Sequence, residues 1–223
     1  MTSKLFFQAI AKFALGVLAL GALLFLPAGT FHYPRAWLLM GILFLPMFVA
    51  GVVLMVKNPE LLKKRLNAKE KQREQSAVVK LSTLMFAAGF VLAGLGVRFG
   101  WPMLPRCVSW VAAAVFLLAY GMYAEVLREN VYLSRTVEVQ QGQRVIDTGL
   151  YGVVRHPMYS ATVFLFLAMP LVLGSAWSFL VFLTYPLILV KRIKNEEAVL
   201  EEGLEGYADY KKKVRYRLIP FVW

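Results

Sequence analysis

The residues best suited to chemistry gather in one short stretch, residues 149–159, which reads GLYGVVRHPMY. An arginine, a histidine and two tyrosines cluster there, directly before an apolar segment that carries no further charge until Lys191. The proline after His156 suits the first turn of a helix, where free backbone N–H groups can bind a carboxylate or another polar group. The alternative is a belt of aromatic and basic residues at a membrane surface.

A second polar group follows that apolar segment. Arg192 and Glu196 are spaced i,i+4, so on a helix they share one face, and Glu197 adjoins them. A guanidinium can clamp a carboxylate through two hydrogen bonds, and a carboxylate can hold an ammonium group. A plain intrahelical salt bridge is the alternative.

The chain that must position these residues is predicted to be an all-α polytopic membrane protein. Of its 223 residues 59% are hydrophobic, and the mean hydropathy is +0.61. Soluble domains are nearer about 45–50% apolar. We expect about six transmembrane helices, because six apolar runs approach the roughly 20 residues that cross a bilayer. These runs cover about residues 5–27, 35–57, 79–98, 104–127, 157–173 and 176–192.

Basic residues divide the two sides of the predicted membrane domain. All of the 25 Lys and Arg residues except Arg35, Arg98 and Arg106 fall on one side. The positive-inside rule places that side and both termini in the cytoplasm, and we expect the bacterial inner membrane as the location. Topology and attraction to anionic membrane lipids explain the net charge of +12, so we expect no nucleic-acid partner.

The segment between the fourth and fifth predicted helices has a different character. Residues 136–140 and 144–147 alternate between apolar and polar types around a Gln-Gly-Gln turn, which indicates a short β-hairpin or paired extended segments. The hairpin would belong to a small cytoplasmic cap that holds residues 149–159 at the membrane surface. The charged segment 60–78 is expected to be a cytoplasmic helix. We divide the chain into N-terminal transmembrane helices (1–127) and a core (128–223), within one structural domain.

Several kinds of site are not expected in this chain. The single cysteine, Cys107, excludes an internal disulfide. His156 is one of two histidines and lacks companion ligands, so we expect no metal site. The sequence contains no GxGxxG, P-loop, HExxH or GxSxG motif. Any cofactor must therefore be held by the membrane domain and its cap.

Four motifs occur in a fixed order over residues 128–223. They are Gly149-x-Tyr151-x-x-x-Arg155-His156-Pro157-x-Tyr159, Glu196-Glu197-x-x-Leu200, Tyr207-x-x-Tyr210 and Arg217-x-x-Pro220. Together they resemble the isoprenylcysteine carboxyl methyltransferase family, and phospholipid methyltransferases share much of the pattern. The chain departs from it at Ala161, where glycine is common, and at Arg215, where proline is common.

The resemblance implies an integral-membrane enzyme that uses S-adenosyl-L-methionine to methylate the carboxylate of an isoprenoid- or lipid-like small molecule. It implies that Arg192 and Glu196 are the catalytic residues, with Arg192 meeting the substrate carboxylate and Glu196 holding the cofactor. The further cofactor contacts that it implies are Gln143, Arg144, Val145, Ile146, Tyr151, His156, Pro157, Met158, Tyr159 and Glu197. The further substrate contacts are Tyr207 and Arg217.

A carboxylate acceptor is consistent with this set of residues. A carboxyl group is already ionised at neutral pH, so methyl transfer to it needs alignment and exclusion of water, not a general base. A phospholipid or amine N-methyltransferase is an alternative, in which Glu197 or Tyr207 would have to remove a proton. An NADPH-dependent enzyme similar to sterol reductases is another, and a transporter or membrane scaffold is the non-enzymatic alternative.

Overall fold

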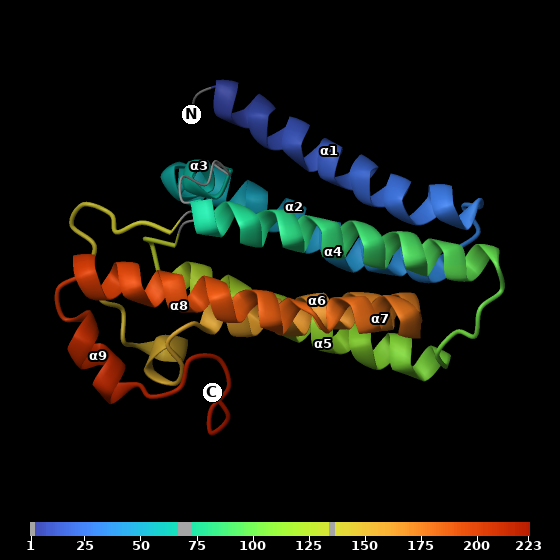
Figure 1. The fold of residues 1–223 in the computed structure, drawn as a ribbon. Coiled ribbons are helices and arrows are strands. Elements are labelled where there is room, and N and C mark those ends of the chain that lie inside the picture. Colours follow the sequence, from blue (N-terminus) through green and yellow to red (C-terminus); the bar gives the residue numbers. More distant parts are fainter. Residues whose placement is uncertain (1–2, 67–72, 134–136) are drawn as a thin grey trace.

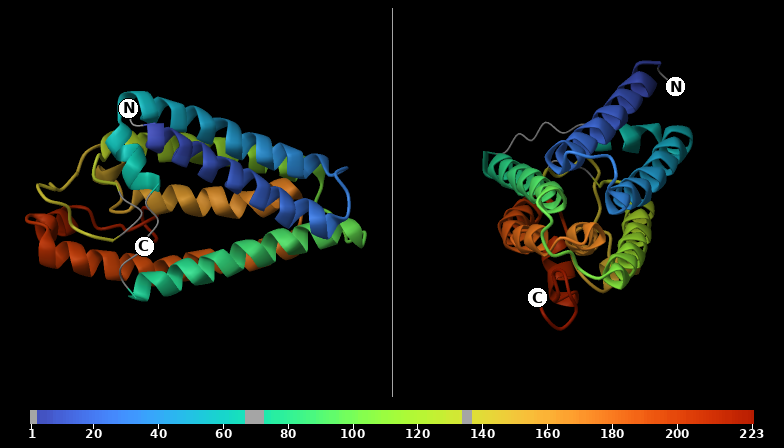
Figure 2. Two further views of the ribbon diagram at one scale, coloured as in Figure 1. Left: turned by 90° about the horizontal axis from the view of Figure 1, so that it is seen from above. Right: turned by 90° about the vertical axis from the view of Figure 1, so that its right-hand side faces the viewer.

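The protein is a bundle of long helices. The computed structural model describes residues 3–66, 73–133 and 137–223. In chain order the elements are α1 (Ser3–Ala28), α2 (Pro34–Lys57), α3 (Pro59–Leu66), α4 (Arg73–Arg98), α5 (Arg106–Glu129), the 3-10 turn η1 (Gly149–Gly152), α6 (Pro157–Leu173), α7 (Ala176–Phe182), α8 (Tyr185–Gly203) and α9 (Tyr207–Lys213). The long helices run roughly along one axis, and an end-on view shows them gathered around a common core (Figures 1 and 2).

Five helical segments are long and apolar enough to cross a membrane. They are Leu5–Ala28, Pro34–Lys57, Ser76–Arg98, Arg106–Glu129 and Ala176–Gly203. At 1.5 Å per residue, a helix of 23 residues spans about 35 Å, more than the roughly 30 Å of a hydrocarbon core. The apolar helix α6 has 17 residues, which is near the lower limit for a span. The predicted all-α polytopic membrane fold is thereby confirmed.

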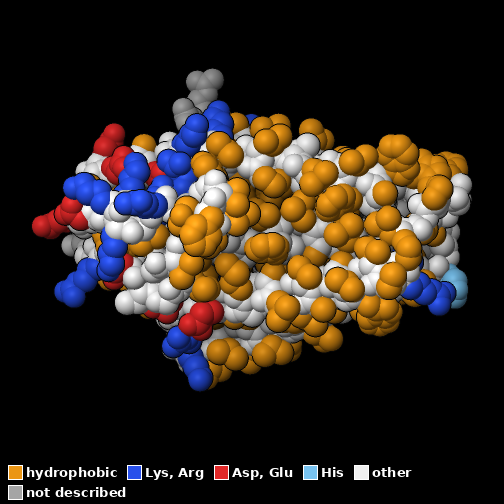
Figure 3. Space-filling view, turned by 90° about the horizontal axis from the view of Figure 1, so that it is seen from below, with side chains coloured by type: hydrophobic (Ala, Val, Ile, Leu, Met, Phe, Trp, Pro, Cys, Tyr) orange, Lys and Arg blue, Asp and Glu red, His pale blue; other side chains and the backbone are white. Residues whose placement is uncertain are grey.

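The surface of the bundle agrees with this assignment. Apolar side chains cover its long middle, while most acidic and basic side chains gather at one end (Figure 3). Large apolar side chains that are more than two thirds exposed include Leu18, Leu45, Val56, Leu118 and Leu187. Such a surface is costly in water and suits lipid. The start of α1, α3, α9 and the C-terminal residues lie toward the same end of the bundle (Figure 1), so these polar segments share one side.

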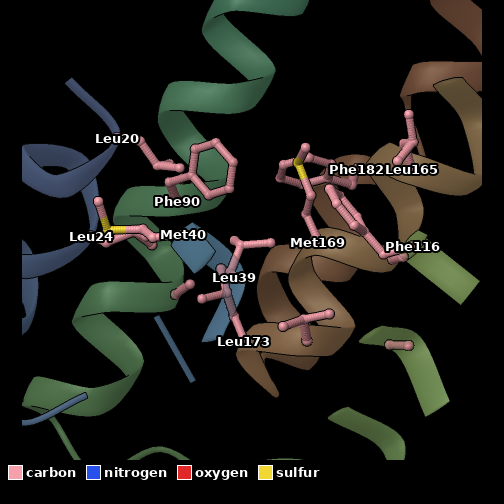
Figure 4. Close-up of a cluster of buried hydrophobic side chains, with 14 of the residues drawn as sticks. Leu20, Leu24, Leu39, Met40, Phe90, Phe116, Leu165, Met169, Leu173 and Phe182 are labelled. Carbon is pink, nitrogen blue, oxygen red and sulfur yellow. The ribbon is translucent and has the colours of Figure 1, made fainter. Parts of the chain in front are cut away.

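Helices pack closely around the apolar core. The fully buried side chains include Phe116 of α5, Phe182 of α7 and Leu173 of α6, which lie near one another in the core (Figure 4). A Cβ atom on Gly94 of α4 would lie 2.6 Å from the carbonyl oxygen of Leu24 in α1. Only glycine fits there, because any Cβ atom would collide with this carbonyl. The glycine thereby lets the backbones of α1 and α4 approach closely, as small residues do in membrane proteins. The most extensive helix contact joins α5 to α6, which fixes α6 within the bundle.

The last predicted span, residues 176–192, is divided into two helices, and the second of them extends beyond residue 192. α7 ends at Phe182 and α8 begins at Tyr185. Pro186 has no N–H to bond the carbonyl four residues earlier, which accounts for the break. α8 then continues to Gly203, about 16 Å beyond residue 192 at 1.5 Å per residue. This extension carries Glu196 and Glu197 on the same rigid helix as Arg192.

The predicted β-hairpin is wrong. Residues 137–147 form no strand; they contain a turn at Gln140–Gln143, closed by a 3.0 Å bond from the N–H of Gln143 to the carbonyl of Gln140, and residue 136 lies outside the described residues. Val139 and Val145 pack against α9 and the end of α8. The alternation of apolar and polar residues therefore comes from contact with these helices and not from strand pairing. The predicted helix 60–78 is described only as α3 and the start of α4, because residues 67–72 lie outside the described residues.

Candidate active site

The candidate site lies at the charged end, where α6 begins beside the middle of α8. His156 is the N-cap residue of α6 and Pro157 is its first residue, so the fixed backbone angle of proline starts the helix at this point. Both residues are buried, and the His156 side chain points to α8. Its Nε2 lies 3.2 Å from Oε1 of Glu197, and its Nδ1 lies 3.9 Å from Oε1 of Glu196.

Tyr159 links the two residues that the sequence singles out on α8. Nε of Arg192 donates a 2.7 Å hydrogen bond to the Tyr159 hydroxyl, and that hydroxyl donates to Oε2 of Glu196. The Arg192 guanidinium also lies over the tyrosine ring, 5.8 Å from its centroid. The buried tyrosine therefore orients a cation and a carboxylate that are one helical turn apart.

Glu197 lies at the centre of a buried ionic cluster. Its Oε1 accepts a 2.7 Å bond from Nε of Arg155, and its Oε2 accepts a 2.9 Å bond from Nε of Arg217. His156 is its third partner, and the Glu197 residue is only 3% exposed. In contrast, the Glu196 side chain is 24% exposed. Glu196 is therefore the carboxylate of this pair that is open to a cationic ligand.

The C-terminal segment, residues 214–223, binds the start of α6 through its backbone carbonyls. The N–H groups of Arg155 and His156 donate 2.9 Å bonds to the carbonyls of Tyr216 and Arg217. The Ser160 hydroxyl donates a 2.6 Å bond to the Leu218 carbonyl, which holds the same segment one turn further along α6. The C-terminal segment therefore fixes the start of α6. The sequence had predicted that the β-hairpin would hold this stretch in place.

Three buried tyrosines, Tyr151, Tyr207 and Tyr210, lie beside the ionic cluster of Glu197. The Tyr210 hydroxyl donates a 2.8 Å bond to the Tyr151 carbonyl, and the Tyr151 hydroxyl accepts a 2.9 Å bond from the amide of Asn130. The buried Tyr207 hydroxyl has no hydrogen-bond partner within residues 3–66, 73–133 and 137–223. Burial raises the pKa of Tyr207 well above its usual value, and the charge of Glu197 acts in the same direction. Tyr207 thus remains a protonated donor, and a buried donor without an acceptor is costly unless a ligand supplies one.

The structure brings most of the proposed site residues together. Those that meet at the start of α6 are Tyr151, His156, Pro157, Tyr159, Arg192, Glu196, Glu197, Tyr207 and Arg217. The other predicted cofactor contacts pack elsewhere or are exposed. The Gln143 side chain accepts a bond from the N–H of Gln140, Arg144 is exposed, and Val145 packs against α9. Ile146 is half-buried, and Met158 packs against the apolar core.

Three residues that support the site were not among the predicted site residues. Arg155 is 6% exposed and donates to the carbonyls of Val214 and Arg215 as well as to Glu197. An arginine between Val-Val and His-Pro in a membrane-surface segment was the available signal, since a buried guanidinium needs several acceptors. No pattern in the sequence signals the bond from Asn130 or the bond from Ser160.

Comparison with known proteins relates part of the chain to one family. Residues 109–202 match the model of the Isoprenylcysteine carboxyl methyltransferase (ICMT) family. The resemblance predicted from the motifs is confirmed over these residues and supports a membrane methyltransferase. The chain is also 30% identical over 91 residues to "Delta(14)-sterol reductase TM7SF2" of Mus musculus, a match that covers 40% of this chain. The chain spans only 22% of the length of that curated relative.

Proposed function

We propose that this protein uses S-adenosyl-L-methionine to methylate the carboxylate of an isoprenoid- or lipid-like acceptor at the membrane surface. The observation that carries the proposal is the link from Arg192 through Tyr159 to Glu196. It holds a cation and a partly open carboxylate side by side at the level where α6 begins. One group suits an anionic acceptor and the other suits a cationic cofactor.

The residues of the site fit such a cofactor. S-adenosyl-L-methionine would supply a reactive methyl group on a positively charged sulfur. Glu196 would hold its ammonium group, and the unpartnered hydroxyl of Tyr207 would donate a hydrogen bond to one of its acceptors. His156 and Tyr151 would line the cofactor, and Glu197 would act on it indirectly by fixing His156 and Arg217.

The protein's own residues then align the acceptor. Arg192 would hold the acceptor carboxylate, and the hydrogen bond from its Nε to Tyr159 would fix the direction of the guanidinium fork. The carboxylate is ionised without help, so the site has to supply position and exclusion of water. The greasy tail of the acceptor would remain among the exposed apolar helices.

A carboxylate acceptor is favoured over an amine acceptor because neither Glu197 nor Tyr207 is suited to remove a proton. Glu197 already accepts bonds from two arginines and faces His156, so its charge is occupied. Burial raises the pKa of Tyr207, which makes its hydroxyl a poor base at neutral pH. An amine needs a residue that removes its proton, and neither of these side chains is suited to that task.

We also propose the topology that goes with this activity. The charged end, with both termini, would face the cytoplasm of a bacterial inner membrane, where most of the basic residues lie. Residues 1–127 would embed and support the site, and residues 128–223 would form it. The acceptor would then reach Arg192 from the inner leaflet, at the depth of a lipid head group.

An NADPH-dependent reductase is the second candidate, because of the similarity to the mouse reductase. Calorimetry on the purified protein in detergent, with S-adenosylhomocysteine and NADPH as separate ligands, distinguishes the two. We expect the first to bind and the second not to bind.

The matched variants for this titration are Glu196→Ala and Glu202→Ala, because Glu202 is exposed on the same helix. We expect Glu196→Ala to weaken binding by about 1.5–3 kcal/mol, the range for a hydrogen bond to a charged group, and Glu202→Ala to leave it unchanged. Tight NADPH binding, or equal affinity in the two variants, would reject the proposal. Binding of neither ligand would favour a transporter or scaffold.

A further inference from the structure

A cavity lies at the end of the bundle opposite to the candidate active site. It has a volume of about 690 Å³ and lies where α2 and α5 begin and α4 ends. Its lining includes His32, Tyr33, Arg35, Trp101, Arg106 and Trp110. In Figure 3 a small group of basic side chains and a histidine marks this end, apart from the charged residues at the other end.

The charge at this end is entirely positive. Residues 1–59 and 75–124 contain no Asp or Glu, so the loops that form this end supply three arginines and no carboxylate. α2 and α5 also direct their N-termini here and α4 its C-terminus, so the partial charges of these three helix ends leave a positive excess. The cavity therefore lies in a positive field that no acidic side chain of these segments balances.

The two arginines that line the cavity differ in their surroundings. Nη2 of Arg35 donates a 2.8 Å bond to the Leu104 carbonyl, while its Nη1 is buried and has no partner among the described residues. A side chain at Gly174, the C-cap of α6, would collide with this guanidinium, so Arg35 is held against the end of α6. The Arg106 side chain is exposed and makes no hydrogen bond or ion pair with any residue that the structure describes. Arg106 is therefore free to meet an anion at the mouth of the cavity.

The surroundings select a lipid anion. The exposed residues near this end include large apolar side chains, among them Phe31, Trp37, Phe99 and Trp110. Tryptophan at the end of a transmembrane bundle marks the level of the head groups. We propose that this cavity binds the phosphate of an anionic phospholipid of the leaflet opposite to the active site. Arg106 and Arg35 would contact the phosphate, and the acyl chains would follow the exposed apolar face of α5. The inference is independent of the proposed function.

The experiment is native mass spectrometry of the whole protein released from detergent. Phosphatidylglycerol and phosphatidylcholine with the same acyl chains are titrated separately, and inorganic phosphate is titrated without lipid. The variants are Arg106→Gln and Arg98→Gln. Arg98 is a matched control, because it lies at the same end and contacts the Phe99 ring but does not line the cavity. Both variants remove the same charge, so any effect of net charge cancels.

We expect the wild-type protein and Arg98→Gln to bind one phosphatidylglycerol more tightly than phosphatidylcholine. Arg106→Gln should lose about fivefold in affinity for that molecule, the effect of one basic residue at an anionic lipid surface. Equal affinities in the two variants, or equal binding of the two lipids, would overturn the proposal. Retention of inorganic phosphate at this site without lipid would show a site for soluble anions and would overturn the assignment to lipid. Circular dichroism of both variants checks that each is folded.

Discussion

Replacement of Glu197 by glutamine tests the role assigned to the ionic cluster. The carboxylate contacts two arginines and His156 and is 3% exposed. Glutamine has nearly the same volume and keeps one acceptor oxygen, so the change removes the charge and one of the two oxygens that accept bonds from Arg155 and Arg217. We expect the variant to be less stable because Arg155, whose side chain is 4% exposed, would keep a positive charge without a negative partner.

The expected loss follows from the burial of each partner. Removing one member of a buried ion pair costs about 3–5 kcal/mol, since the other charge stays buried and uncompensated. Arg155 keeps two carbonyl acceptors, at Val214 and Arg215, which reduces the penalty. The Arg217 side chain is 27% exposed and can be hydrated. We therefore expect the lower end of this range, about 3 kcal/mol.

The assay is SDS-induced unfolding of the purified protein in mixed micelles, followed by circular dichroism. Glu202→Gln is the matched control, because Glu202 is exposed on the same helix. Limited proteolysis provides a second measurement, since the C-terminal segment should be cut earlier in Glu197→Gln, in which Arg217 loses its ionic partner on α8. If the two variants unfold within about 0.5 kcal/mol of each other, the usual range for surface substitutions, the reasoning about the buried charge is refuted.

Four further predictions follow from the same structure. Arg192→Lys keeps the charge but loses the planar fork, so methyl transfer should fall at least tenfold while cofactor affinity changes less than twofold; full activity would show that Arg192 is not the acceptor clamp. Tyr207→Phe should leave the free protein as stable or stabilise it by about 1 kcal/mol, because the hydroxyl lacks a partner, yet weaken cofactor binding. Because burial raises the pKa of Tyr207, its hydroxyl should still donate at pH 10, so calorimetry should show the same difference in affinity between the wild type and Tyr207→Phe at pH 7 and at pH 10; a difference that disappears near pH 10 would contradict the buried state of the hydroxyl. Reporter fusions after Ser76 and after Trp223 should both report the cytoplasm, and an external signal from either would refute the topology.

The helices were predictable because apolar length is a strong constraint in a membrane. A bilayer leaves no water for backbone groups, so each long apolar run has to be helical. The ends and breaks depend on more local causes. The break before α8 follows from Pro186, which the hydropathy pattern does not register. The continuation of α8 past residue 192 was not predicted either, because a polar stretch of helix gives no hydropathy signal.

The hairpin prediction failed because alternation has two physical sources. Val139 and Val145 alternate with polar residues, which fits a strand, but they pack against the cluster of Leu204, Tyr207 and Tyr210. A short loop that contacts a helix on one side shows the same pattern as a strand with one buried face. The sequence alone cannot separate the two cases.

The candidate site was predictable where the motif residues lie on helices. The i,i+4 spacing of Arg192 and Glu196 correctly placed both on the face of α8 that meets Tyr159. The contacts of the C-terminal segment were not predictable, because Arg155 and His156 bond to its backbone carbonyls and not to its side chains. Any residue type can supply a carbonyl, so the sequence records no preference at those positions.

The central claim is that the site transfers a methyl group to a carboxylate. The most direct measurement incubates the purified protein with radiolabelled S-adenosyl-L-methionine and two sets of acceptors, a prenylated cysteine analogue and bacterial lipids. Base treatment then releases volatile methanol from methyl esters but not from methylated amines. We predict label that is released by base, formed by the wild-type protein and lost in Glu196→Ala. Label that resists base, or no transfer to any acceptor together with binding of NADPH, would contradict the claim.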